Sequence, residues 1–219
     1  MKIFTKNKPA FTMLELIFVI VVLAIIASIA MPRLDRDLKQ DAADNILADI
    51  RYTQQLAMMD FKHNFNDPKW QKSFWRIGFE SCAGTSGYYE YIGSDMSYAG
   101  GISDVEAAID PANGKKMIWT GADCTDGGDS VTSDRLFLTH KYGVTLFASA
   151  GGCDAQYIGF DHLGRPHRGF AGAGGDIANY AGYMSTDCNL TFTMTNTDTF
   201  TITVQKETGY AFIVGQEGS

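Results

Sequence analysis

Hydrophobic and polar positions divide the chain into stretches with different periodicities. From Leu16 to Ala30 no side chain is charged, and Ser28 is the only polar one. Counted over residues 11–31, this apolar run is about as long as a helix that crosses a bilayer. Glu15 lies at its start, where an ionised carboxylate in hydrocarbon costs several kcal/mol unless a partner is close.

A helical period continues beyond Pro32, because a proline kinks a helix without necessarily ending it. Apolar residues recur at spacings near three, four and seven, at Leu34, Leu38, Ile46, Ile50 and Ala57. This pattern predicts one helix from about residue 12 to about residue 60. Its first half is apolar all round, and its second half presents an apolar stripe to a folded domain.

After Lys69 the period changes to two, which is typical of half-buried strands. The pattern predicts strands over residues 73–80, 88–92, 116–119, 135–139, 144–148 and 156–161, although residues 81–133 are rich in Gly, Ser and Asp. A hairpin with its turn at residues 196–198 joins strands 190–195 and 200–205, and a last strand covers 210–214. One long helix on an antiparallel sheet or sandwich is an α+β fold.

The charge pattern bears on location and partners. The net charge is −7, and Lys2, Lys6 and Lys8 precede the apolar run with no acidic residue among them. Such a cluster predicts a cytoplasmic amino terminus and an exported carboxy-terminal domain. Without these lysines the remaining chain is more acidic still, which disfavours binding to nucleic acid.

Four widely spaced cysteines suit an exported domain. Cys82, Cys124, Cys153 and Cys188 form no CxxC and no close pair of the kind found in structural zinc sites. In an oxidising compartment they predict two disulfides with three possible connectivities. We favour Cys82–Cys124 with Cys153–Cys188, while the other two pairings and four reduced core thiols stay open.

The stretch from Lys8 through Phe11 and Glu15 to the apolar run resembles the amino-terminal signature of type IV pilins and type II secretion pseudopilins. The resemblance implies cleavage between Ala10 and Phe11 by a prepilin peptidase and N-methylation of Phe11. It also implies a helix-kinking role for Pro32. The family usually has Gly before the cut, where this chain has Ala10. The likeness is strong over residues 8–34 and faint beyond.

The resemblance implies a pilin-like organisation of the whole chain. A leader covers residues 1–10, a transmembrane or filament-core helix half 11–31, an amphipathic helix half 32–60, and a periplasmic β-rich domain 61–219. The expected partners are other pilin or pseudopilin subunits, the prepilin peptidase, the inner-membrane assembly platform and the lipid bilayer. The protein is expected in the inner membrane as a single-pass chain, and afterwards in a pilus or pseudopilus.

Glu15 has a physical role in this interpretation. In a bundle of helices its carboxylate can meet the free amine of Phe11 on a neighbouring subunit. Because a buried charge without a partner is costly, this pairing would also fix the axial register between subunits. The alternative is an ordinary membrane anchor, in which Glu15 stays hydrated at the interface.

A second, shorter resemblance concerns the carboxy-terminal third. Residues 158–166, the strands after them and Thr208-Gly209 look like the minor pseudopilin and minor pilin branch, the GspH/FimT type. The likeness implies a β-sandwich packed on the helix and a minor subunit. Any all-β domain could also contain such a strand, glycine turn and hairpin.

Candidate chemistry outside this signature is sparse. Asp123, Asp126 and Asp129 could offer oxygen ligands to Ca²⁺, but Asp-Gly clusters are also ordinary turns. His162, Arg165, His167 and Arg168 predict a small basic tip, which could contact DNA or another anionic partner or be a solvated turn. GxSxG, HExxH and GxxxxGK[ST] do not occur in the sequence. We therefore expect no enzyme and no cofactor.

Two other functions compete with the structural subunit. One is a minor pilin whose globular domain binds DNA or a surface. The other is a periplasmic protein with a conventional signal peptide, cut after the small residues Ser28-Ile29-Ala30. Glu15 at the start of the apolar run argues against the signal peptide, and the mature amino terminus separates the two, Phe11 in one case and Met31 in the other.

Overall fold

A computed structural model describes residues 13–84, 87–124, 127–153, 156–172 and 182–217, apart from the side chains of 28–37. The contacts divide the chain into two units, Met1–Asp37 and Leu38–Ser219. The helix expected over residues 12–60 is confirmed as α1 (Met13–Met59), which contributes residues to both units. The proposed leader and cleavage site, residues 1–11, lie outside the described residues.

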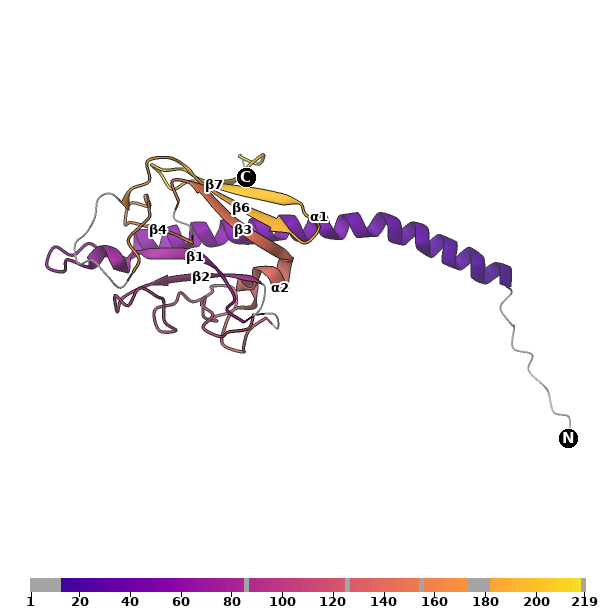
Figure 1. Cartoon of the computed structure of the whole chain (residues 1–219), viewed down its shortest axis with the longest axis horizontal. Coiled ribbons are helices and arrows are strands. Elements are labelled where there is room, and N and C mark those ends of the chain that lie inside the picture. The colour runs from indigo at the N-terminus through magenta and orange to yellow at the C-terminus, as the bar shows by residue number, and fades with distance from the viewer. Residues whose placement is uncertain (1–12, 85–86, 125–126, 154–155, 173–181, 218–219) are drawn as a thin grey trace, which may run out of the picture. The chain divides into compact units, whose positions relative to one another are not determined.

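The second unit contains two antiparallel sheets of four strands each (Figure 1). The first has the order β2-β1-β4-β5, with β1 (Trp75–Ser81), β2 (Tyr88–Ser94), β4 (Tyr157–Phe160) and β5 (Pro166–His167). The second has the order β3-β6-β7-β8, with β3 (Val144–Gly151), β6 (Cys188–Met194), β7 (Thr199–Val204) and β8 (Ala211–Ile213). The described short helices are η1 (Trp70–Ser73), η2 (Asp134–Leu136) and α2 (Leu138–Tyr142). This layout confirms the α+β class.

The main core lies between α1 and the two sheets. The helix buries a stripe at spacings of one, three and four, formed by Ala42, Ala43, Ile46, Leu47, Ile50 and Ala57. The sequence pattern is confirmed for Ile46, Ile50 and Ala57. It is wrong for Leu38, which is 42% exposed because it lies at the first residue of the second unit. The side chain of Leu34 lies outside the described residues.

A group of phenylalanine rings joins the sheets to each other. Phe79 of the first sheet lies 4.8 Å from Phe147 and 5.3 Å from Phe192 of the second, measured between ring centroids. Phe192 in turn stacks on Phe200 of the neighbouring strand at 5.0 Å. Because burying each such ring stabilises the fold by roughly 1.5–3 kcal/mol, this group fixes the two sheets against each other.

The carboxy-terminal hairpin follows its sequence pattern. In β6, Leu190, Phe192 and Met194 are buried, and Phe192 pairs with Phe200 of β7. Thr197 takes a φ of 71° at the predicted turn. The expected strands 73–80, 88–92, 144–148, 156–161 and 210–214 are confirmed as β1, β2, β3, β4 and β8, with ends shifted by at most three residues.

Two expected strands are wrong. Residues 116–119 make only isolated bridges, from Lys116 to Ile109 and to Thr132. Residues 135–139 form η2 and the start of α2. There Leu136, Phe137 and Leu138 are all fully buried, and three consecutive buried side chains suit a helical turn better than a half-exposed strand. Gly143 ends α2 in the left-handed conformation, with φ 78°.

Candidate functional site

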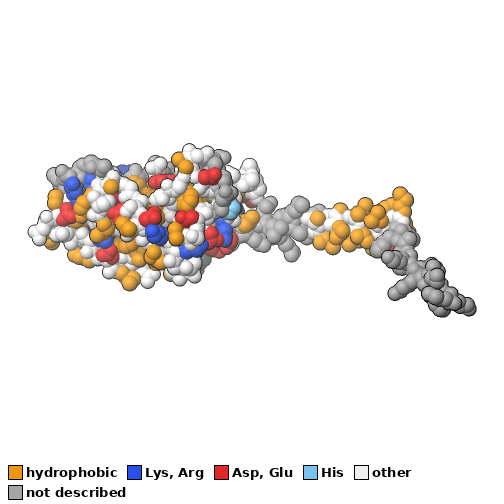
Figure 2. Space-filling model, turned by 90° about the horizontal axis from the view of Figure 1, so that it is seen from below, with side chains coloured by type: hydrophobic (Ala, Val, Ile, Leu, Met, Phe, Trp, Pro, Cys, Tyr) orange, Lys and Arg blue, Asp and Glu red, His pale blue; other side chains and the backbone are white. Residues whose placement is uncertain are grey.

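The candidate site is the first part of α1, which belongs to the first unit. Its described side chains, residues 13–27, are exposed, and most of them are large and apolar. Leu14 is 79% exposed, Phe18 70% and Leu23 58%, and Figure 2 shows hydrophobic side chains gathered on this segment. A helix that is hydrophobic all round is buried in its working environment, by lipid or by other helices. This segment is therefore the part of the chain that needs a partner.

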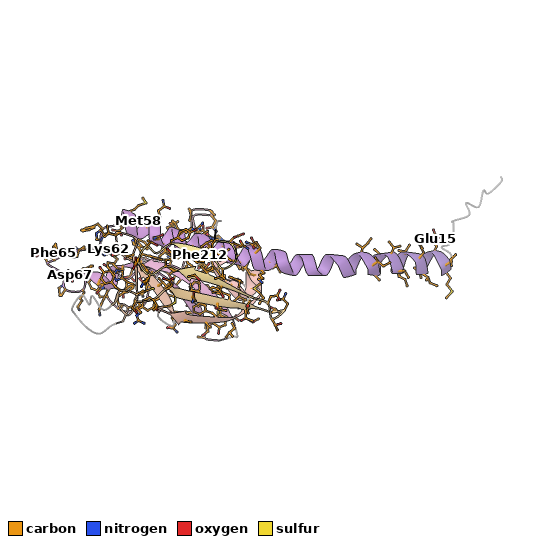
Figure 3. All side chains as sticks on the ribbon, turned by 90° about the horizontal axis from the view of Figure 1, so that it is seen from above. Glu15, Met58, Lys62, Phe65, Asp67 and Phe212 are labelled. Atoms are coloured by element: carbon orange, nitrogen blue, oxygen red, sulfur yellow. A yellow bond between two sulfur atoms is a disulfide. The ribbon has the colours of Figure 1, made fainter. Side chains whose placement is uncertain are left out.

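Glu15 lies in the first turn of α1, at its third residue (Figure 3). It is the only charged residue between positions 13 and 27. A negative charge at this end of a helix is favoured by the helix dipole. Phe11 and Ala10 lie outside the described residues, as does the side chain of Pro32, although α1 runs through position 32.

The expected membrane-spanning segment covers residues 11–31, of which the structure describes only part. In that described part, no helix has the length and the apolar character needed to cross a membrane.

Polar contacts fasten the second part of α1 to the rest of the second unit. Arg135 of η2 donates to Asp49 of α1 at 2.7 Å and to Asp110 at 2.7 Å. Burial raises the pKa of Asp110, but hydrogen bonds from Ser133 and Arg135 outweigh it and lower that pKa overall. Sequence reasoning missed this network because its members lie up to 86 residues apart.

Near its end α1 also holds two turns of the second unit. Gln54 donates to the backbone oxygens of Gly164 at 2.8 Å and Thr208 at 2.9 Å. Arg51 donates to the backbone oxygen of Ala211 at 3.1 Å. The helix is thus bonded to the β4–β5 turn, to the β7–β8 turn and to the start of β8, which keeps its direction fixed within this unit.

The two disulfides are the pair favoured from the sequence, Cys82–Cys124 and Cys153–Cys188. Cys82–Cys124 links the end of β1 to the irregular segment after residue 95, and Cys153–Cys188 links the residues after β3 to the start of β6. Cys82 and Cys124 belong to a second, smaller core with Tyr91, Ile118 and Phe137. The first disulfide therefore secures a segment that has little strand pairing of its own.

The structure describes only part of the proposed calcium site, Asp123 and Asp129. Asp129 accepts hydrogen bonds from the backbone N–H groups of Val131 and Thr132, at 3.0 and 2.7 Å, which is ordinary turn chemistry. Asp126 lies outside the described residues. Among the residues that are described, no three His, Cys, Asp or Glu side chains are placed to hold a metal ion. The calcium site stays a prediction.

The expected basic tip is corrected by the structure. His167 is only 2% exposed and lies 3.2 Å from Asp161, so it is not at a solvated tip. Arg165 also binds Asp161, at 2.7 Å, and the hydroxyl of Tyr183 at 2.9 Å. Arg165 and His167 are both bonded to the carboxylate of Asp161, the residue that follows β4. The charge of Arg165 is therefore neutralised internally.

A small hollow of about 210 Å³ lies beside this network. It is lined by His63, Trp70, Phe74, Asp161, His162, Arg165 and Tyr183. Its rings contact one another, with His63 and Trp70 at 4.4 Å between centroids. Figure 2 shows acidic and basic side chains interspersed on the face in view, whereas a phosphate backbone needs a positive field of single sign.

Comparison with known families gives one match, over the segment that carries the exposed apolar helix. Residues 5–31 match the prokaryotic N-terminal methylation motif. The chain carries the signature of type IV pilins and pseudopilins. No curated protein and no solved structure matches the chain.

This signature bears on the general type of protein. It supports a type IV pilin-like or pseudopilin subunit in general, a type that assembles with other pilin subunits and is processed by a prepilin peptidase. It also indicates anchoring in a membrane by the amino-terminal helix. The motif ends at residue 31 and so does not identify a branch of the family.

Proposed function

We propose that this protein is a minor subunit of the pseudopilin type, which enters a type II secretion pseudopilus or a type IV pilus through α1. The observation that carries the proposal is the methylation signature over residues 5–31, within which Glu15 is the only acidic residue. A carboxylate held in an apolar helix needs a counter-charge, and a free amine at Phe11 of a neighbouring subunit would supply it.

The role as a minor subunit is supported by the second unit. It has two sheets, two disulfides and a second small core over the irregular segment after β2. We regard such a large and elaborate domain as better suited to a minor subunit at a specialised position than to the repeated packing of a major filament subunit. The proposed topology has the amino terminus in the cytoplasm and the second unit in the periplasm, in keeping with the lysines before the apolar run.

The expectations of no enzyme and no cofactor stay predictions. Binding of DNA by the second unit loses its main argument, because Arg165 and His167 are bound to Asp161. The conventional signal peptide remains the rival that the experiment below separates.

The test compares the wild-type chain with Glu15→Ala in cells that produce a prepilin peptidase and the other filament components. Asp41→Ala is the matched control, since it removes an exposed carboxylate from the same helix. Mass spectrometry of the purified protein identifies the mature amino terminus. Sedimentation of sheared filaments measures incorporation.

We expect a methylated Phe11 terminus in the wild type, and normal incorporation of Asp41→Ala. Glu15→Ala should remain in the membrane fraction but fail to enter filaments. A mature terminus at Met31 would establish the signal-peptide alternative. Normal incorporation of Glu15→Ala would refute the charge-pairing mechanism.

A further inference from the structure

A polar cluster lies inside the main core, where α1 meets the first sheet. Asp49 of α1 is 1% exposed, while Glu90 of β2 and Asp110 of the following segment are fully buried. Arg135 of η2 is the cation that bonds to this cluster. Three carboxyl groups therefore surround one guanidinium, so the cluster cannot be neutral if all three are ionised.

The hydrogen bonds show which carboxyl groups the guanidinium of Arg135 contacts. Arg135 donates to Asp49 and Asp110, and a further hydrogen bond, at 2.9 Å, goes to the side-chain oxygen of Asn45. Glu90 receives no hydrogen bond from Arg135. It accepts instead from the amide of Asn45, at 3.0 Å, on Oε1 alone. Glu90 is thus the carboxyl group in the cluster that lacks a direct cation.

Two carboxyl oxygens in this cluster have no donor if both groups are ionised. They are Oδ2 of Asp49 and Oε2 of Glu90, which are buried and unsatisfied among the described residues. The two side chains are also within hydrogen-bonding reach of each other. Two bare carboxylates in contact repel, whereas one proton between them makes an O–H···O bond that satisfies both oxygens.

We propose that Asp49 and Glu90 share one proton in the folded protein at neutral pH, and that this proton fastens α1 to β2. The proton belongs mainly to Glu90, because Asp49 is already paired with Arg135. Burial raises the pKa of Glu90 well above its usual value, and the charge of Asp49 raises it further. The proposal is independent of the proposed function, since it concerns only the second unit.

Among the described groups that interact with the pair, none is another base that could take this proton. The further titratable groups that interact with Asp49 or Glu90 are Tyr52 of α1, Asp110, Arg135 and Tyr142 of α2. Burial raises the pKa of Tyr52 and of Tyr142, so both phenols are neutral at pH 7. Asp110 is held ionised by Ser133 and Arg135. Asp49 and Asp110 therefore already more than balance the one positive charge in the cluster, without Glu90.

The shared proton has a consequence for stability. The folded pKa of Glu90 lies above the unfolded value, so folding takes up a proton in the pH range between the two. This contribution to stability is fully present below the ordinary pKa of a glutamate, 4.5, and is lost as the pH rises through the folded value. Within that range the unfolding equilibrium constant should rise up to about tenfold per pH unit from this pair alone.

The first experiment detects the proton directly, using the full chain in detergent micelles. Infrared difference spectra of wild type and Glu90→Gln at pH 7 should show a protonated carboxyl band that the variant lacks. Glu207→Gln is the matched control, because it makes the same chemical change at an exposed position, and its spectrum should keep the band. A wild-type spectrum without this band at pH 7 overturns the proposal, whether or not the variant folds.

The second experiment measures urea unfolding of the same three proteins between pH 6 and pH 9. Glutamine keeps an N–H donor toward Asp49 and cannot ionise. The unfolding free energy of Glu90→Gln should therefore fall less than that of the wild type as the pH rises. Wild type and Glu207→Gln should keep it. Identical pH dependence in all three proteins would overturn the proposal.

Discussion

Removing the two disulfides one at a time would test what each contributes. The variants are Cys82→Ala with Cys124→Ala, and Cys153→Ala with Cys188→Ala. The linked residues are 42 and 35 positions apart. If a disulfide acts by restricting the unfolded chain, loops of these lengths give about 4 kcal/mol each at 25 °C. Both variants should therefore lose similar amounts of unfolding free energy.

The folded states of the two variants should differ, although the losses are similar. Cys153–Cys188 lies beside the pairing of Gly151 with Cys188, which already holds β3 to β6. Cys82–Cys124 secures residues 95–133, where the described pairing is limited to isolated bridges. Loss of Cys82–Cys124 should therefore loosen this segment in the native protein, and loss of the other disulfide should not.

Two measurements on the full chain in detergent micelles test these expectations. Urea unfolding followed by tryptophan fluorescence should show midpoints lowered by about 2 M, since an m-value of about 2 kcal/mol/M is typical. Native-state hydrogen exchange should show faster exchange over residues 95–133 in the Cys82/Cys124 variant alone. An unchanged unfolding free energy in either variant would refute the chain-entropy reasoning, and equal exchange in both would refute the local role.

The remaining predictions concern the turns that α1 contacts. Gly209→Ala should destabilise the protein by about 1–3 kcal/mol in thermal unfolding, because Gly209 has a φ of 68° and an added Cβ would lie 2.3 Å from the oxygen of Gly164. Asp161→Asn should lower the unfolding free energy by about 2 kcal/mol at pH 7. This is less than the loss expected on breaking a fully buried ion pair, because the side chain of Arg165 is 38% exposed. Hydrogen bonds from His167 and Arg165 outweigh burial and lower the pKa of Asp161, so its contribution is present above pH 3.8 and lost as the pH falls below it. Acid unfolding of Asp161→Asn should therefore depend less on pH, and an unchanged acid profile would refute this assignment.

Local pattern was sufficient for the long helix and for most strands. The spacing of Ile46, Ile50 and Ala57 predicted the buried face of α1, because a helix in contact with a core on one side repeats its apolar residues at that spacing. The alternation of apolar and polar residues around Phe192 predicted β6, because successive side chains of a strand point to opposite faces of the sheet. The pattern failed at residues 135–139, where consecutive buried side chains came from a compact turn inside the core.

The site residues also include some that the sequence alone reveals and others that only the fold brings together. Glu15 and the apolar run are visible in the sequence because their physical meaning depends only on neighbours along one helix. The network of Asp49, Glu90, Asp110 and Arg135 is not visible there, since its members come from four separate segments. The basic tip was mispredicted for the same reason, because Asp161 binds both Arg165 and His167 only once the chain has turned after β4.

The sequence by itself determined that this chain carries a pilin-type signature, a long helix and a β-rich domain with four cysteines. Periodicity and motif spacing are local properties, and they remain readable without a fold. Only the tertiary structure decided which cysteines pair, which charges are neutralised and which carboxyl groups lie in contact. Those outcomes depend on distances between segments far apart in the chain, and these distances are set by packing α1 against the two sheets.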